Sequence, residues 1–477
     1  MNLVFIFADQ LQAAALGCTG NPDVQTPNID ALAAEGVTFA NSVSCFPVCT
    51  PFRASLISGR YPHSIDVMDN DVPLPLNGQG FGYALKGSKM ATGWIGKWHL
   101  LGSMQHRSTF IPPGIHRHGF DDYWAGLNCT HDYINGCEYI NSSPVMQKFE
   151  GYRPDVEADH AIKFIKKNKG APFALFWSAG TPHDPYHTVP EKWKKLYDVE
   201  SLTFRPNVFE DVPMEVNCSP GNAPDTNEHH TYFERVYGAY SNDPEVRRRP
   251  NKMVLRDYYA AITNLDWNVG RIMEALKSEG VADETIVVFT ADHGDMMYSH
   301  GLTQKNYPWD ESVLVPFIMR CPKKINKGQQ CSSPFNTVDI MPTILDLLGI
   351  DIPPYCEGVS FAPAVLNMAQ KLPDCAYIMN AWPWAIPEWR GIRTQKYTYA
   401  EFADGPALMY DNQLDPYQLV NLINLPEYAS LQQSLQLMYQ EKQSAIGDNF
   451  EKWQSISKRM QAKREEWEAA FGEDLLM

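Results

Sequence analysis

The chain has 477 residues, of which 44% are hydrophobic, 12% aromatic and 20% charged, a composition that supplies a packed core and excludes a disordered protein. This length allows two or three domains, or one large domain with an appendage. The 56 acidic and 40 basic residues give a net charge of −16, which leaves no general positive field to attract nucleic acid or an anionic membrane. We therefore expect no nucleic-acid partner and no membrane partner.

The N-terminus and the cysteines leave the cellular compartment of the protein open. No apolar run approaches the roughly 20 residues that span a bilayer. The N-terminus lacks the basic start and cleavage site of a secretory leader. We expect a periplasmic or secreted protein if a leader was removed, and a cytoplasmic one otherwise. The 10 cysteines are scattered, so reduced thiols and a few disulfides both stay open.

Short β-forming apolar runs alternate with helical patterns through most of the chain. Four runs predict buried parallel strands: residues 2–8 (NLVFIFA), 172–179 (PFALFWSA), 284–291 (ETIVVFTA) and 315–320 (VPFIMR). Residues 26–36 begin with Thr before Pro and end in Gly, which predicts a short helix, and a longer helix is expected over 253–278. The alternation indicates an α/β fold with a large, mostly parallel, doubly wound sheet.

The pattern changes past about residue 370. Residues 389–402 (WRGIRTQKYTYAEF) and 407–416 (ALMYDNQLDP) predict antiparallel strands, and helical segments follow them. We expect a catalytic domain over 1–370 and a smaller C-terminal α+β subdomain with an antiparallel sheet over 371–477. Residues 199–250, rich in Pro, Asn and charge, predict a long surface insertion.

Acidic residues cluster after two of the predicted strands. Asp9 and Gln10 follow the first strand, and Asp292, His293 and Asp295 follow a later one. A single Asp in such a place more often caps a helix or forms a turn. Two groups at the same edge of a sheet instead favour a metal site, and oxygen ligands with one imidazole suit calcium or magnesium better than zinc.

The sharpest local pattern is C-x-P-x-R within residues 46–60 (FPVCTPFRASLISGR), formed by Cys49, Pro51 and Arg53. Pro51 is expected at the first position of a helix, which would place Cys49 at its positive end. Taken alone, the pattern is equally compatible with a buried structural cysteine. Its rarity by chance favours a functional role.

In these motifs and in several further segments, the chain resembles the formylglycine-dependent sulfatases of the alkaline-phosphatase-like superfamily. The order and approximate spacing match along nearly the whole length. The segments that carry the resemblance are FADQ (7–10), TPNIDALAAEG (26–36), VCTPFRASLISGR (48–60), GWIGKWHLLG (93–102), TPHDPY (181–186), TADHGD (290–295), HGLTQKNYPWDESVLVP (300–316) and RGIRTQKYTY (390–399). In that family the Cys of C-x-P-x-R is oxidised after translation to formylglycine, which implies a maturing enzyme as a partner.

Carried over by position, the resemblance implies a metal site formed by Asp9, Gln10, Asp292 and His293, with the modified Cys49 also in contact with the ion. Calcium is the usual occupant, and magnesium is the second choice. Many members have Asp where this chain has Gln10, and Asn where it has His293. Replacing a carboxylate lowers the negative charge of the site.

The chemistry of sulfate esters explains why such a cluster needs cations. The ester oxygens repel nucleophiles, so a divalent ion and nearby ammonium groups must neutralise them as the S–O bond breaks. Lys97 and Lys305 are the expected ammonium groups. By resemblance, the hydrated aldehyde at Cys49 offers one hydroxyl as nucleophile and the other later expels sulfate, and we expect Arg53 to orient it.

Two histidines are the expected proton-transfer groups. His183 best fits the donor to the departing alcohol. His99 follows Lys97 by two residues on what is expected to be an extended segment, so both side chains would point to one side, and His99 could start the second half of the reaction. Each residue alone is equally compatible with a surface charge or a packed ring.

These features predict a sulfatase that hydrolyses sulfate monoesters of a sulfated small molecule or glycan, and two rivals stay open. One is a phosphonate monoester or phosphodiester hydrolase of the same superfamily, since relatives with Gln and His at the places of Gln10 and His293 include such activities. The other is an inactive protein that binds sulfated glycans. Trp382, Trp384 and Trp389 near Arg390 could form a sugar-stacking platform, or they could pack in the core.

Overall fold

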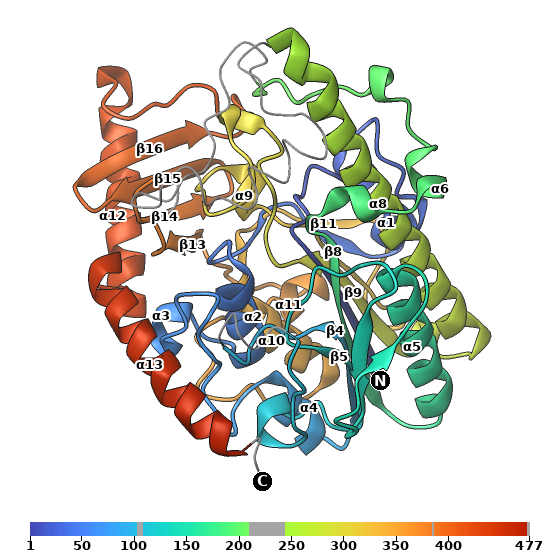
Figure 1. Ribbon diagram of the computed structural model, residues 1–477. Helices are drawn as coiled ribbons and strands as arrows, with labels where there is room; N and C mark the ends of the chain where they lie inside the picture. Colours follow the sequence, from blue (N-terminus) through green and yellow to red (C-terminus); the bar gives the residue numbers. More distant parts are fainter. Residues whose placement is uncertain (103–107, 209–243, 384–385, 475–477) are drawn as a thin grey trace.

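The computed structural model describes residues 1–102, 108–208, 244–383 and 386–474 (Figure 1). A ten-stranded sheet runs through the molecule in the order β11-β2-β10-β9-β1-β8-β4-β5-β6-β7. Its strands are β1 (Asn2–Asp9), β2 (Val37–Phe39), β4 (Ala91–Lys97), β5 (Tyr123–Leu127), β6 (Cys137–Ile140), β7 (Gln147–Lys148), β8 (Phe173–Pro182), β9 (Thr285–Ala291), β10 (Phe317–Arg320) and β11 (Gln329–Cys331). A separate two-stranded pair is formed by β3 (Ser42–Val43) and β12 (Phe335–Asn336).

Helices cover both faces of the large sheet (Figure 1). One face carries α1 (Pro27–Ala34), α5 (Arg153–Asn168), α6 (Glu191–Lys194) and α8 (Pro244–Ser278). The other carries α2 (Cys49–Ser58), α3 (Pro62–Ile65), α4 (Phe81–Gly87), α10 (Thr337–Leu348) and α11 (Ala362–Val365). Shorter elements are α9 (Asp310–Val313), η1 (Gly17–Thr19), η3 (Ile115–Arg117), η4 (Tyr186–Thr188), η5 (Val199–Ser201), η7 (Ala282–Glu284), η8 (Ser299–Gly301) and η9 (Pro426–Tyr428).

The central strand β1 has an apolar run because side chains on both of its faces pack in a core. Phe5 and Phe7 belong to the core on the α2 side, and Phe7 lies 6.5 Å from Phe52 between ring centres. Val4 and Ile6 belong to the core on the side of α5 and α8. Because both faces are covered, the side chains from Leu3 to Ala8 are all apolar, and the acidic residue comes only at the carboxyl end of the strand.

Most of the predicted elements of this domain are confirmed, with two corrections. β1, β8 and β9 are parallel, and α1 lies within the predicted 26–36. The strand expected at 315–320 is present as β10, but it is antiparallel to β9. The chain between β9 and β10 stays at one edge of the sheet and does not cross back as a helix, which a parallel strand would require. The helix expected over 253–278 begins earlier, because α8 starts at Pro244.

The C-terminal part has the predicted antiparallel sheet and helices. The sheet has the order β13 (Cys375–Asn380), β14 (Trp389–Thr394), β15 (Tyr397–Phe402) and β16 (Gly405–Asp411), and α12 (Ala429–Ile446) and α13 (Trp453–Asp474) follow it. α13 runs back along the larger part (Figure 1), where Lys463 and Arg464 pair with Asp66 and Asp69 at 2.6 and 3.2 Å. The domain boundary at residue 370 stays a prediction.

Several smaller expectations can be placed. None of the helices in the described part of the chain is long and apolar enough to cross a membrane. The cysteines that the structure describes are free thiols. Trp389 is fully buried and so packs in the core, Trp382 is half-buried and stacks on Trp453 at 6.3 Å, and Trp384 lies outside the described residues. Of the insertion expected at 199–250, residues 209–243 also lie outside them.

Candidate active site

Two neighbouring strands deliver the acidic groups to one place. β1 and β9 are parallel, and Ala8 pairs with Ala291, so the next residues, Asp9 and Asp292, emerge side by side at the carboxyl edge of the sheet. The main-chain N–H of Gln10 donates to Asp292 Oδ1 at 3.0 Å, and Gln10 has a positive φ of 67° that turns the chain away from the strand. All of these carboxylate and amide groups are fully buried.

Cys49 enters this cluster from the start of α2. Its side chain is 2% exposed, and Sγ lies 3.3 Å from His293 Nε2 and 3.7 Å from Asp9 Oδ1. Pro51 was expected at the first helical position but is the third residue of α2, which begins at Cys49 itself. The first turn tolerates proline because its N–H groups have no partner within the helix. Cys49 therefore lies at the positive end of α2, as predicted.

Ligand atoms of Asp9, Cys49, Asp292 and His293 lie within 4.8 Å of one another. This set fits a hard divalent cation, because it offers two carboxylates and one imidazole in a buried place where the carboxylates would otherwise repel each other. Burial lowers the pKa of His293, but Asp292 and Cys49 together raise it above its usual value. Four of the five predicted metal ligands thus converge, and the side-chain oxygen of the fifth, Gln10, lies 2.7 Å from Lys305 Nζ.

Arg53 holds the two carboxylates in place. Its guanidinium donates to Asp9 Oδ2 and Asp292 Oδ2, both at 3.1 Å, to Ser178 Oγ at 2.6 Å and to the carbonyl that ends β4 at 3.0 Å. All of these groups are buried. The expectation that Arg53 orients residue 49 stays a prediction, because the hydrogen bonds go to the carboxylates that flank Cys49.

The two predicted lysines contact different members of the cluster. Lys97, at the end of β4, has Nζ 2.6 Å from Asp9 Oδ2. Lys305 has Nζ 2.7 Å from Gln10 Oε1 and 3.6 Å from Cys49 Sγ. Burial and Asp9 raise the pKa of the Cys49 thiol, but Lys305, Lys97 and His293 together lower it below its usual value. The site therefore stabilises negative charge at position 49.

His183 lies beside Lys305 at the end of β8. Its Nε2 is 3.0 Å from Lys305 Nζ, and its Nδ1 is 2.8 Å from the main-chain oxygen of Asp184 and 3.1 Å from its carboxylate. Burial, followed by Lys305, lowers the pKa of His183 well below its usual value, although Asp184 opposes this. The ring of His131 stacks on His183 with 4.5 Å between ring centres. Sequence reasoning missed His131 and Asp184.

His99 is half-buried near Lys97, but the segment is not extended as predicted. β4 ends at Lys97, and His99 has a positive φ of 54°. Its N–H donates to the Asn128 carbonyl at 2.6 Å, and its carbonyl accepts from Thr50 Oγ1 at 2.8 Å. The turn ties His99 to the residue next to Cys49. Burial and then Lys97 lower the pKa of His99 well below its usual value, so its imidazole is neutral.

Two further residues of the site were not assigned a role from the sequence. Tyr186 closes the TPHDPY segment, and Asp295 closes TADHGD. Both contact the side-chain amide of Gln10, with Nε2 donating to Tyr186 Oη at 3.0 Å and to Asp295 Oδ2 at 2.5 Å. Both residues lie in strings that carry the resemblance, and Asp295 also belongs to the acidic group that follows a predicted strand.

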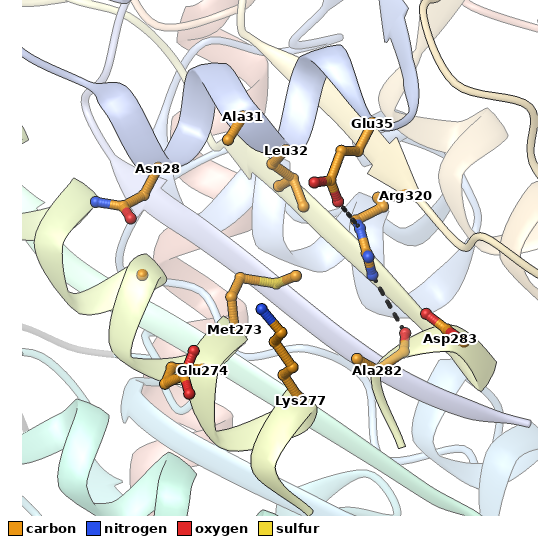
Figure 2. A pocket seen from close by; sticks show the side chains of 11 residues that line it. Asn28, Ala31, Leu32, Glu35, Met273, Glu274, Lys277, Ala282, Asp283 and Arg320 are labelled. Atoms are coloured by element: carbon orange, nitrogen blue, oxygen red, sulfur yellow. Dashed lines mark hydrogen bonds and ion pairs between the residues drawn. The ribbon is translucent and has the colours of Figure 1, made fainter. Parts of the chain in front are cut away.

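A separate cavity lies elsewhere and is lined by none of the predicted site residues. It has a volume of about 350 Å³ and lies between α1, α8 and the segment that precedes β9 (Figure 2). Figure 2 shows Glu35 and Arg320 paired at its rim, at 2.7 Å, and Arg320 also donates to the Ala282 carbonyl. Arg320 pairs in the sheet with Val287, near the start of β9, so the cavity lies toward the opposite end of that strand from Asp292.

Known proteins resemble this chain over most of its length. The Sulfatase family model matches residues 1–350, and the model of the N-sulphoglucosamine sulphohydrolase C-terminal region matches residues 298–445. The chain is 36% identical over 459 residues to the Ulvan-active sulfatase of Formosa agariphila, a match that covers 94% of this chain and 82% of the relative. It is 27% identical to the N-acetylglucosamine-6-O-sulfatase of Bacteroides thetaiotaomicron, covering 94% and 87%.

Solved structures share the fold over nearly the whole chain. A structure of a protein in complex with its substrate D-glucosamine-2-N,6-O-disulfate superposes with a TM-score of 0.79 at 25% identity, covering 94% of this chain and 98% of the other. The phosphonate monoester hydrolase of Agrobacterium radiobacter superposes with a TM-score of 0.71 at 21% identity, covering 94% and 96%. The latter likeness shows the fold alone, which is the alkaline-phosphatase-like fold predicted from the sequence.

Proposed function

The chain belongs to the sulfatase family and is a sulfuric ester hydrolase, and from this premise we propose that it removes sulfate from a sulfated carbohydrate with a formylglycine at position 49 and one divalent cation. The observation that carries the proposal is the convergence of Asp9, Cys49, Asp292 and His293 within 4.8 Å. These residues come from three separate elements. Two buried ammonium groups lie beside them.

The cation would be held by Asp9, Asp292, His293 and the Gln10 oxygen, with calcium preferred and magnesium second. When bound, it would polarise the sulfate oxygens and stabilise the charge that develops on them. The residues of the chain supply the rest of that stabilisation. Lys97 and Lys305 are buried, so their charges act on a bound sulfate with little screening by water.

The position of Cys49 suits the residue that attacks sulfur. A hydrated aldehyde there would supply one hydroxyl that attacks and a second that allows sulfate to be released, which a serine could not do. The same environment that lowers the pKa of the Cys49 thiol would favour the ionised form of a hydroxyl at this position. The proposal requires a formylglycine-maturing enzyme as a partner of the newly made chain.

His183 is the proposed proton donor to the departing alcohol. A sulfate group bound to Lys305 would compete for the ammonium that now donates to His183 Nε2. The carboxylate of Asp184, at 3.1 Å, would then favour the protonated ring. His99, which is neutral, is the proposed acceptor of the proton in the second half of the reaction.

The proposed substrate class rests on the relatives. The names of the two most similar relatives described above refer to ulvan and to N-acetylglucosamine 6-O-sulfate, and the substrate in the superposed structure is a glucosamine disulfate. A sulfated sugar is therefore the substrate class we propose for this chain. The sugar and the sulfate position depend on loops outside the charged cluster.

Two rival functions make different predictions in one assay. The second candidate is a phosphonate monoester or phosphodiester hydrolase, because relatives with Gln and His at the places of Gln10 and His293 include such activities. An inactive glycan-binding protein is the third, although every residue of the sulfatase pattern is present.

The test uses protein made together with a maturing enzyme and checked for formylglycine by peptide mass. Aryl sulfate, phosphonate monoester, phosphodiester and defined sulfated sugars are compared on that one preparation, with Cys49→Ala as the control. The proposal predicts that kcat/KM is highest for sulfate esters and that Cys49→Ala abolishes turnover. Faster phosphonate or phosphodiester turnover, or glycan binding without sulfate release, would contradict it.

A further inference from the structure

The Gln10 side chain is held at both ends of its amide. Its Nε2 donates to Tyr186 Oη at 3.0 Å and to Asp295 Oδ2 at 2.5 Å. Its Oε1 accepts from Lys305 Nζ at 2.7 Å. An ammonium can only donate, so the end of the amide that faces it must be the oxygen, and the NH2 end faces the carboxylate. Gln10 is fully buried, so water does not compete for these positions.

We propose that Tyr186 and Asp295 are positioning residues, which hold the Gln10 amide so that its oxygen faces Lys305 and the group of Asp9, Cys49, Asp292 and His293. The inference rests on the proposed function, because it assigns this oxygen to the cation. A carboxylate at position 10 would need no such device, since its two oxygens are equivalent. An amide turned the other way would present its NH2 to a cation and an ammonium.

The two positioning residues are themselves fixed. Tyr186 donates its hydroxyl to Asp295 Oδ2 at 2.6 Å, so its oxygen is free to accept from the Gln10 amide. Asp295 Oδ1 accepts from the main-chain N–H groups of Met297 at 2.8 Å and Gln304 at 3.1 Å. Because Gln304 precedes Lys305, the Asp295 carboxylate binds both the Gln10 amide and the main chain next to Lys305. Lys305 in turn donates to the oxygen of that amide.

Burial strengthens this arrangement. Every member of the Gln10, Tyr186, Asp295 and Lys305 group is at least nine-tenths buried. In such surroundings a hydrogen bond is stronger than in water, and the loss of one partner leaves a polar group without a substitute. Residues that orient metal ligands in this way typically change metal affinity or activity by about 10- to 100-fold when they are replaced.

The experiment measures Ca2+ binding to chelator-treated, full-length protein by isothermal titration calorimetry. Tyr186→Phe is expected to weaken Ca2+ binding about 10-fold. The matched control is Tyr258→Phe, since the Tyr258 hydroxyl is also buried but donates to the main-chain oxygen of Gln10 at 2.9 Å and not to its amide. This control is expected to change the Kd by less than about twofold.

A double-mutant cycle separates positioning from general damage to the fold. In a Gln10→Ala background, Tyr186→Phe should have no further effect on the Kd, because the group it orients is gone. Asp295→Asn, which keeps the shape but turns an acceptor into a donor, should weaken binding in the Gln10 background and serves as the second variant if Tyr186→Phe does not fold.

The outcomes distinguish this inference from the proposed function. If the wild-type protein binds Ca2+ and both Tyr186→Phe and Asp295→Asn bind it with the same Kd, the positioning role alone is overturned. A loss that persists in full in the Gln10→Ala background would also overturn it. A wild-type protein that binds no Ca2+ would overturn both the positioning role and the cation of the proposed function.

Discussion

The two ends of β9 carry polar groups of very different kinds. At the carboxyl end, Asp292 and His293 join a cluster of buried charges, in which Arg53 pairs with both Asp9 and Asp292. At the other end, the charges that line the cavity between α1 and α8 meet solvent, as in the pair of Arg320 with Glu35, whose side chain is 57% exposed. The comparison teaches that function follows the convergence of buried charge and not the presence of a cavity.

Buried charge is costly unless it is compensated, so the largest expected effect follows from removing one partner. Arg53→Ala leaves Asp9 and Asp292 without their shared counter-ion and should lower the free energy of unfolding by about 3–5 kcal/mol. Arg320→Ala at the other end of the strand should cost about 1 kcal/mol or less. Chemical unfolding of both variants, in chelator, measures the two values. Equal losses of unfolding free energy in the two variants would contradict the difference proposed between the two ends of β9.

A second test concerns the ammonium groups. Lys305→Met should lower kcat for sulfate esters by about 10²- to 10³-fold, because the charge that stabilises the developing negative charge is lost. Lys277→Met, in the cavity of Figure 2, should leave kcat unchanged. Steady-state assays on matured protein measure kcat of both variants. An equal loss of kcat in Lys277→Met would contradict the assignment of catalysis to the carboxyl end of β9.

A third, smaller effect is expected at the proton donor. His183→Gln should lower kcat about 10²-fold for sugar sulfates, whose alcohols are poor leaving groups, and less for aryl sulfates. The ratio of the two losses is the diagnostic quantity. If both substrates lose activity equally, His183 acts in sulfate binding and not as the donor.

The smallest effect tests the α1–α8 end. Burial raises the pKa of Asp266 to about 6, although hydrogen bonds from Ile29 and Asn28 oppose it. The folded state therefore binds a proton more readily than the unfolded state, so this residue makes stability fall as pH rises from about 4 to about 6, on the order of 2 kcal/mol. Asp266→Asn should flatten this part of the stability profile. An unchanged profile would show that Asp266 is not responsible.

The sequence allowed the strand ends to be predicted, because an unbroken apolar run that stops at a carboxylate is a local pattern. Asp9 and Asp292 were found in this way, and their meeting follows from parallel pairing of neighbouring strands. The direction of β10 was not predictable from its own residues, since it depends on the path of the chain that precedes it.

Other parts of the site depend on contacts between distant segments. The stacking of His131 on His183 joins two loops that no spacing relates, and the choice of Asp9 and Asp292 as partners of Arg53 depends on how α2 packs on the sheet. The positive φ of His99 likewise shows that the backbone is not extended there, which the spacing from Lys97 did not reveal. The chemical types were readable from the sequence, whereas their mutual orientation was not.

The central claim is that the oxidised form of Cys49, in this buried charged cluster, is the group that attacks sulfur. The most direct measurement is the initial rate of sulfate release in preparations matured to different extents, plotted against the fraction of formylglycine at position 49 determined by peptide mass. The account predicts a straight line that passes through zero rate at zero formylglycine. A rate that stays constant as this fraction falls would contradict it.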